Sequence, residues 1–229
     1  MSHSLRVMDL GRLDYEAALA VQERVLEAKT RGAADDCLIL VEHPHVITTG
    51  RREARAHILD PGGVTVLATS RGGDVTYHGP GQLVAYPIVD LKSKLRRAVH
   101  RYLDGLEQVI IDVLGSFGLA GARRPPFTGV WTGDRKICAI GIAVRRGVTY
   151  HGAALNVAPD LSYFRRIVPC GLEWAQVTSI ERETGRSIEM ETVKHLLVQE
   201  FCRRFGYDGL ARDGDETEPA ASSGSTRGA

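Results

Sequence analysis

The sequence predicts an α/β (α+β) fold in which helices cover a mixed β-sheet. Two patterns support this. One apolar stripe recurs at steps of three and four residues, predicting a long helix that ends at Gly118 and can cover one face of a sheet. Residues 129–157 alternate as strand, turn, strand, turn, strand, with turns at 132–134 and 145–147, which indicates a β-meander. The stripe consists of Leu95, Val99, Leu103, Leu106, Ile110, Val113 and Phe117.

The other elements follow in chain order. Residues 4–10 suit an opening strand, after which Asp14 can cap a helix that Gly32 ends. The continuous apolar run at 37–41 is typical of a central strand. Shorter strands are expected at 46–49, 64–69 and 82–89, a short helical patch at 160–167 and a last helix at 192–205.

Length and composition indicate one domain. With 229 residues and 43% hydrophobic content, residues 1–208 can bury one core, whereas 209–229 contain no aromatic residue and are expected to be a disordered tail. The net charge of +1 gives no overall field for holding nucleic acid or an anionic membrane. No apolar stretch is long enough to span a membrane, and Arg6 and Asp9 interrupt the region where a signal peptide would be apolar, so we expect a cytoplasmic protein.

A glycine-rich segment, RGGDVTYHGPGQ at 71–82, is the first candidate binding site. It places four glycines and a proline in twelve positions directly after an apolar strand. Glycine lets backbone N–H groups approach a ligand closely, although the same composition also suits a tight turn between strands. The spacing of a P-loop is absent, so the segment does not indicate a nucleotide site.

Two cysteines and a lysine are the candidate reactive groups. Lys136 and Cys138 fall on one face of an expected strand, and Cys170 lies between Pro169 and Gly171 in VPCGL. A lysine ammonium close to a thiol favours the thiolate, so a Cys–Lys pair supplies a nucleophile and a proton carrier. Spacing alone does not choose between the two cysteines, and the alternatives are a solvated lysine and simply buried cysteines.

The segment YHGAALN at 150–156 joins His151 to three small residues. Small side chains can line a slot for an apolar chain, or they can allow tight packing against the sheet. The four cysteines are widely spread without a CxxC pair, and His43 and His45 lack a convincing third ligand nearby. We therefore expect reduced thiols, no disulfide framework and no metal.

Taken in order, RGGDVTYHGPGQ, RKICAIGI, YHGAALN and VPCGL resemble the signature set of the octanoyl-[acyl-carrier-protein]:protein N-octanoyltransferases, the lipoyl(octanoyl) transferase or LipB family. The match covers roughly residues 5–205. It implies a single octanoyltransferase catalytic domain with a mixed, mainly antiparallel sheet and flanking helices, of the lipoate–protein ligase and biotin ligase catalytic-domain type.

The resemblance also implies the site. It assigns the acyl-thioester cysteine to Cys170 and its partner lysine to Lys136, which leaves Cys138 without a role. The implied substrate-binding residues come from three segments: Arg71, Gly72, Gly73, Asp74, Val75, Thr76, Tyr77 and His78; Ala139, Ile140 and Gly141; and Gly152, Ala153 and Ala154.

The implied reaction has two steps and needs no cofactor. Octanoyl-acyl carrier protein donates the octanoyl group to Cys170, and a lysine of a lipoyl domain then accepts it, in the first step of endogenous protein lipoylation. The implied acceptors are the lipoyl domains of 2-oxoacid dehydrogenases and the glycine cleavage H protein. Rival functions are an ATP-dependent lipoate or biotin ligase, an amidotransferase between lipoyl proteins, and a catalytically silent acyl-binding module.

Carrier proteins are acidic, so arginine pairs are candidate docking groups, with ordinary solvated loop charge as the alternative. The pairs are Arg51-Arg52, Arg123-Arg124, Arg145-Arg146 and Arg165-Arg166.

Overall fold

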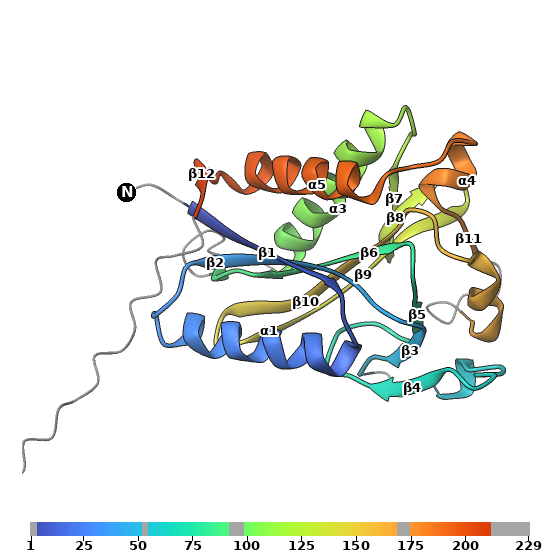
Figure 1. The fold of residues 1–229 in the computed structure, drawn as a ribbon, viewed down its shortest axis with the longest axis horizontal. Helices are drawn as coiled ribbons and strands as arrows, with labels where there is room; N and C mark the ends of the chain where they lie inside the picture. The colour runs from blue at the N-terminus through green and yellow to red at the C-terminus, as the bar shows by residue number, and fades with distance from the viewer. Residues whose placement is uncertain (1–3, 52–54, 92–98, 169–174, 212–229) are drawn as a thin grey trace, which may run out of the picture.

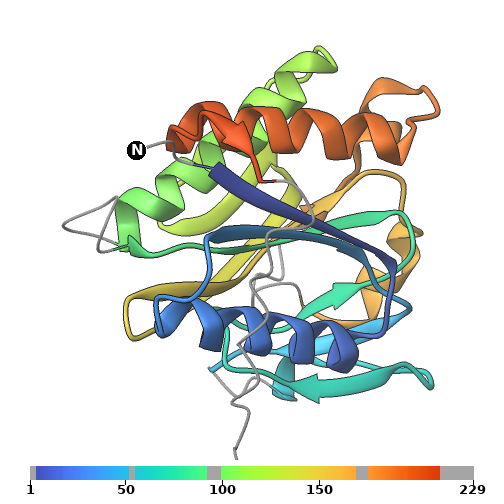
Figure 2. The same ribbon diagram turned by 60° about the vertical axis from the view of Figure 1, so that its left-hand side comes forward.

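A long, mixed β-sheet forms the centre of the protein (Figures 1 and 2). The computed structural model describes residues 4–51, 55–91, 99–168 and 175–211. Pairing is parallel between β12 and β1, β1 and β2, and β11 and β9, and antiparallel between the other neighbours. The mixed, mainly antiparallel sheet is therefore confirmed. Its strands, in spatial order, are β12 (Gly209–Leu210), β1 (Ser4–Arg12), β2 (Asp36–Glu42), β6 (Gln82–Ile88), β10 (Val148–Asn156), β9 (Arg135–Arg145), β8 (Phe127–Thr132) and β7 (Ala122–Arg124), with β11 (Gln176–Val177) beside β9.

Helices cover both faces of this sheet. The helix α1 (Tyr15–Thr30) lies on one face, and α3 (Val99–Ser116) and α5 (Met190–Phe205) lie on the other, as Figure 1 shows. Successive side chains of a strand point to opposite faces, and β2 follows this rule. Leu38 and Leu40 join the apolar cluster of α3 and α5, whereas Ile39 joins that of α1. The central strand is thus buried on both sides, which explains its continuous apolar sequence.

A smaller sheet packs beside the main one. It consists of β4 (Thr65–Ala68), β3 (Val46–Thr49) and β5 (Thr76–His78), in that order. The 3₁₀ helices η1 (Arg55–His57) and η2 (Leu161–Arg166) and the short helix α4 (Ile180–Thr184) complete the described elements. A third apolar cluster joins this sheet to η2 through Ile47, Tyr77 and Phe164.

The differences from prediction lie at element ends and in short strands. Asp14 occupies the residue before α1, but its side chain makes no capping hydrogen bond. Gly209 and Leu210, assigned to the tail by the sequence, instead pair with β1, because this edge strand offers unpaired backbone groups. The strand β5 was not predicted, because it lies within the glycine-rich segment, where glycine and proline indicate a turn. Leu95, at the start of the predicted long helix, lies outside the described residues.

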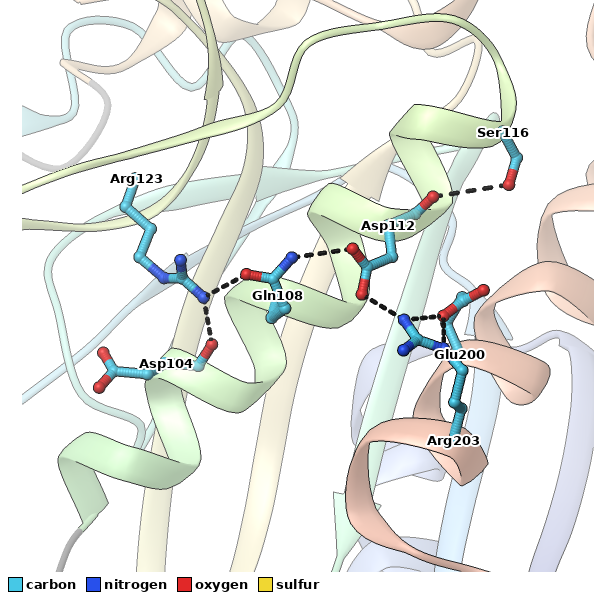
Figure 3. A network of polar contacts seen from close by, with 7 residues as sticks. All are labelled: Asp104, Gln108, Asp112, Ser116, Arg123, Glu200 and Arg203. Atoms are coloured by element: carbon cyan, nitrogen blue, oxygen red, sulfur yellow. Dashed lines mark hydrogen bonds and ion pairs between the residues drawn. The ribbon is translucent and has the colours of Figure 1, made fainter.

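A polar network holds α3, α5 and the β7 region together on their outer side (Figure 3). Arg123 donates to the Asp104 carbonyl oxygen over 2.7 Å and to Gln108 over 3.0 Å. Arg203 of α5 reaches Asp112 of α3 over 2.6 Å. This network fixes α3 against the sheet from which the site is built. In the part of the chain that is described, no helix is both long and apolar enough to cross a membrane.

Candidate functional site

A narrow pocket lies where the glycine-rich segment crosses β9 and β10. The cavity is small, with a volume of about 40 Å³ for the centre of a water molecule. Every residue that the sequence assigned to substrate binding lines this pocket except Tyr77. The first segment, which lies more than 60 positions before the other two in sequence, is therefore brought to the same place as them. The full lining is Tyr15, Arg71, Gly72, Gly73, Asp74, Val75, Thr76, His78, Val84, Tyr86, Ala139, Ile140, Gly141, His151, Gly152, Ala153 and Ala154.

Tyr77 points the other way because side chains alternate along β5. Its neighbours Thr76 and His78 line the pocket, while the Tyr77 ring packs against Tyr163 and Phe164 at centroid distances of 5.2 and 5.1 Å. Tyr77 thus anchors η2 to the small sheet instead of facing the pocket.

The small residues of the pocket allow three backbones to approach closely. The Gly72 N–H donates to the Ile142 carbonyl oxygen over 2.8 Å, which lays the glycine-rich segment directly on β9. A Cβ atom on Gly141 would lie 2.6 Å from the Gly72 oxygen, and one on Gly152 would collide with the Ala85 carbonyl oxygen. Both glycines are therefore required by packing, and the slot itself is flanked by the paired residues Ala139 and Ala154.

Two buried charged side chains fix the glycine-rich segment. Arg71 donates to the Thr48 carbonyl oxygen over 2.6 Å and to the Gly72 carbonyl oxygen over 3.1 Å. Asp74 accepts from the Val75 N–H over 2.6 Å and contacts His57 Nδ1 at 2.9 Å. Such bonds hold the loop in one conformation and so prepare the pocket before a ligand arrives.

The two histidines of the pocket are neutral at physiological pH. Burial, together with the nearby His43 and Arg71, lowers the pKa of His78 to about 3. Burial and the positive charges of Arg71, Arg51 and Arg145 lower the pKa of His151 to about 4. The pocket is therefore suited to an uncharged ligand portion, such as an alkyl chain, and not to an anion held by imidazolium.

A chain of buried hydrogen bonds leads from the pocket toward Lys136. His78 Nδ1 contacts Gln82 Oε1 at 2.7 Å, Gln82 donates to Asn156 Oδ1 over 2.8 Å, and Asn156 donates to the Thr178 carbonyl oxygen over 2.9 Å. The Thr178 N–H in turn donates to the Lys136 carbonyl oxygen over 2.9 Å. Each side chain in this chain has a partner, so the network has one arrangement.

Lys136 is buried at the start of β9, with 5% of its surface exposed. Its ammonium lies 5.4 Å from the centre of the Trp131 ring, a cation–π distance. A Cβ atom on Gly129 would lie 2.7 Å from Lys136 Cε, so the absence of a side chain there makes room for the lysine. The alternative of a solvated lysine is thus excluded, because the Lys136 side chain is buried.

The structure distinguishes the two candidate cysteines only in part. Cys138 is fully buried, and burial raises the pKa of its thiol to about 12 despite the nearby Lys136 charge. It is therefore a protonated, inaccessible thiol and a poor nucleophile. Cys170 lies outside the described residues, within 169–174.

The described residues on each side of that segment are attached to the site. The Val168 N–H donates to the His57 carbonyl oxygen over 2.7 Å, and His57 contacts the pocket residue Asp74. On the other side, Val177 pairs with Lys136 itself. Val168 and Ala175 both line a wider hollow of about 970 Å³. The described residues that flank 169–174 are therefore connected to the pocket residue Asp74 through Val168 and His57, and to Lys136 through Val177.

Sequence reasoning missed four residues of the pocket: Tyr15, Val84, Tyr86 and His151. The position of His151 directly before Gly152 was a usable signal. The other three lie on α1 and β6 within ordinary apolar patterns, so nothing in their local sequence separates them from the core.

Several of the arginines proposed for docking have partners within the chain. Arg123 forms an ion pair with Glu107 at 3.2 Å, Arg145 with Glu23 at 3.5 Å and Arg166 with Asp60 at 3.9 Å. These pairs stabilise local structure, so a docking role is not needed to explain them.

Comparison with known proteins agrees with this geometry. The profile of the lipoyl protein ligase A/B catalytic domain matches residues 14–202. An octanoyltransferase of Solibacter usitatus is 49% identical over 207 residues, covering 88% of this chain and 93% of the relative. An octanoyltransferase of Geobacter metallireducens is 45% identical over 197 residues, covering 86% and 92%.

Solved structures share the fold at lower identity. A lipoate-protein ligase A bound with ATP matches with a TM-score of 0.76 at 16% identity, covering 93% of this chain and 88% of that one. A biotin protein ligase from Aquifex aeolicus in complex with biotin and ATP matches with a TM-score of 0.56 at 12% identity, covering 89% and 70%. The predicted fold type is confirmed, and the chain belongs to the lipoyl protein ligase A/B catalytic-domain family, among whose members it is similar to proteins named octanoyltransferase.

Proposed function

We propose that this protein is a cytoplasmic acyltransferase that moves an octanoyl group from octanoyl-acyl carrier protein to a lysine of a lipoyl domain, through a thioester on Cys170. The observation that carries the proposal is the pocket. Its wall of small residues, neutral histidines and tightly bound backbone suits an alkyl chain, and it lies along the same strand as the buried Lys136. The similarity to octanoyltransferases supports the choice of acyl group.

In the first step, the Cys170 thiolate attacks the carbonyl carbon of the carrier-protein thioester. The bond to the carrier's thiolate breaks, the octanoyl group remains on Cys170, and Lys136 transfers the proton from one sulfur to the other. One thioester replaces another, so the step requires no ATP. The Lys136 charge would also favour the Cys170 thiolate.

In the second step, the ε-amine of the acceptor lysine attacks the acyl-enzyme. Lys136 takes a proton from the attacking amine, the amide bond forms as the bond between the acyl carbon and the Cys170 sulfur breaks, and Lys136 passes the proton to that sulfur. Formation of an amide from a thioester is downhill, which drives the transfer. The acceptors that we propose are the lipoyl domains of 2-oxoacid dehydrogenases and the glycine cleavage H protein.

Backbone N–H groups of the glycine-rich segment other than those of Gly72 and Val75, which are already bonded to Ile142 and Asp74, are candidates for stabilising the oxyanion in both steps. They are already fixed by Arg71 and Asp74, so they would need little reorganisation when charge develops.

Intact-protein mass spectrometry tests the proposal directly. The protein is incubated with octanoyl-acyl carrier protein without acceptor, and we expect one octanoyl adduct that hydroxylamine removes and that maps to Cys170. Cys170→Ser should abolish the labile adduct, whereas the matched variant Cys138→Ser should retain it, because Cys138 is buried and protonated.

Lys136→Met should fold, because methionine replaces the buried aliphatic stem of the lysine, but it should form the adduct at least about 100-fold more slowly. If free octanoate with ATP acylates a lipoyl domain as well as the carrier-protein donor does, the protein is a ligase. An adduct that stays on Cys170→Ser would show that another residue accepts the acyl group.

A further inference from the structure

His151 closes the end of the pocket that lies away from Lys136. Along β9, the pairing with β10 runs from Ala139 and Ala154 through Gly141 and Gly152 to Ile142 and His151. The glycine-rich segment reaches the same point of the sheet, because the Gly72 N–H donates to the carbonyl oxygen of Ile142, the residue paired with His151. Two strands and the glycine-rich segment therefore meet at His151.

The His151 ring is anchored by Ser70, and the His151 backbone is anchored by α1. Its Nε2 contacts Ser70 Oγ at 3.0 Å, and Ser70 Oγ also contacts the Tyr150 hydroxyl at 3.0 Å. The backbone N–H of His151 donates to Gln22 Oε1 of α1 over 3.0 Å. The side chain is 1% exposed, so the ring cannot swing out to solvent without breaking these contacts.

Two features of His151 are unusual for a strand residue. Its φ angle is +55°, in the left-handed region that non-glycine residues seldom adopt. Its Nδ1 is buried and has no hydrogen-bond partner in the described structure. A strained backbone and an unsatisfied polar atom both cost stability, and they persist in native proteins mainly where function requires the side chain.

The distance along the strand matches a chain of defined length. From Ala139 to Ile142 the backbone advances three residues, or about 10 Å. This is close to the extended length of an eight-carbon acyl chain. A chain whose carbonyl group lies toward Lys136 would therefore end against the His151 ring.

We infer that His151, held by Ser70, is the residue that limits acyl chain length in this pocket. The inference rests on the proposed acyl transfer and adds the residue that selects among donors. A longer chain has to displace a buried ring that Ser70 anchors, whereas a shorter chain leaves apolar surface uncovered.

The test compares decanoyl and octanoyl donors as the ratio of their kcat/KM values. His151→Asn removes most of the ring but keeps a residue that tolerates positive φ. Each methylene that finds apolar room is worth about fourfold in binding, so two methylenes should raise the ratio by about 15-fold. Ser70→Ala removes only the anchor of the ring at an exposed position, and it should raise the ratio by a smaller factor.

Ile142→Val is the matched control. Ile142 pairs with His151 across the strands, but its side chain belongs to the apolar cluster of α3 and α5. We expect the decanoyl-to-octanoyl ratio of kcat/KM in Ile142→Val to stay within about twofold of that of the wild type.

A merely structural role would lower kcat/KM for both donors equally. A ratio within twofold of the wild type in His151→Asn would overturn the inference, provided that the wild type transfers octanoyl. If the wild type transfers no acyl group, the proposed function itself fails. If His151→Asn does not fold, Ser70→Ala is the deciding variant. An unchanged decanoyl-to-octanoyl ratio of kcat/KM in Ser70→Ala would then reject the role of His151 in limiting chain length.

Discussion

Acidification should destabilise this protein well above the pH at which carboxylates protonate. The relevant groups are His78 and His151, whose pKa values fall from 6.5 to about 3 and about 4 on folding, mainly because burial disfavours the charged ring. The unfolded chain therefore takes up a proton at each histidine near pH 6.5, while the folded chain does not. Protonation favours the unfolded state throughout this window, so stability is complete above pH 6.5 and declines as the pH falls toward 4.

The magnitude follows from the width of the window. One pH unit below 6.5 lowers the free energy of unfolding by about 1.4 kcal/mol per histidine. At pH 5 each of the two histidines therefore lowers it by about 2 kcal/mol relative to neutral pH. Together His78 and His151 remove about 4 kcal/mol, a large share of the total of about 5–15 kcal/mol for a typical domain.

Urea denaturation at pH 7 and pH 5 measures this loss of unfolding free energy. The slope of the free energy against urea concentration should be the same at both pH values, so that the two results can be compared. His151→Asn should reduce the loss by about 2 kcal/mol, because asparagine does not titrate. His100→Asn is the matched control for replacing a histidine by asparagine, because His100 is exposed and lies outside this pocket. A free energy of unfolding that stays constant between pH 7 and pH 5, or a loss that is the same in His151→Asn, would refute the reasoning.

Three further substitutions probe the packing behind the site. Gly152→Ala should lower the free energy of unfolding by about 2 kcal/mol or more, because the added Cβ collides with the Ala85 carbonyl oxygen; an equally stable variant in urea would mean that β6 and β10 can separate. Asn156→Ala removes the buried hydrogen bonds to Gln82 and Thr178, so it should lower the free energy of unfolding by about 2–3 kcal/mol and slow acyl transfer at 25 °C. A free energy of unfolding equal to that of the wild type would show that water replaces the amide. Gly129→Ala places a methyl group 2.5 Å from the Cys138 carbonyl oxygen and 2.7 Å from Lys136 Cε, at a φ of +123° that favours glycine, so it should lower both the free energy of unfolding and kcat. Urea denaturation and steady-state kinetics measure the two effects, and a folded variant with a change in KM alone would argue against a role for the lysine in the chemical step.

Regular elements were predictable where local pattern and burial agree. The helix α5 and the strand β2 follow from apolar periodicity, since one repeats every three or four residues and the other is continuous. The short strand β5 was missed because its three residues sit among glycines whose local chemistry favours a turn, while pairing with β3 decides otherwise.

The site was predictable as a set of motifs, and their arrangement was not. Glycine density and small residues marked the three segments that line the pocket, and the resemblance to a known family assigned them to one ligand. The sequence could not say that Gly141 and Gly152 are needed for backbone contact, because that requirement comes from the Gly72 and Ala85 carbonyl oxygens of other segments.

The sequence by itself determined the fold class, the membership of the family and the residue types of the candidate chemistry, because periodicity, turn residues and motif spacing are local properties. Only the tertiary structure decided that Cys138 is buried in the core, that Tyr77 faces away from the pocket and that His151 lines it. The physical reason is that burial, pKa and facing depend on which strands become neighbours, and strand pairing joins residues that lie far apart along the chain.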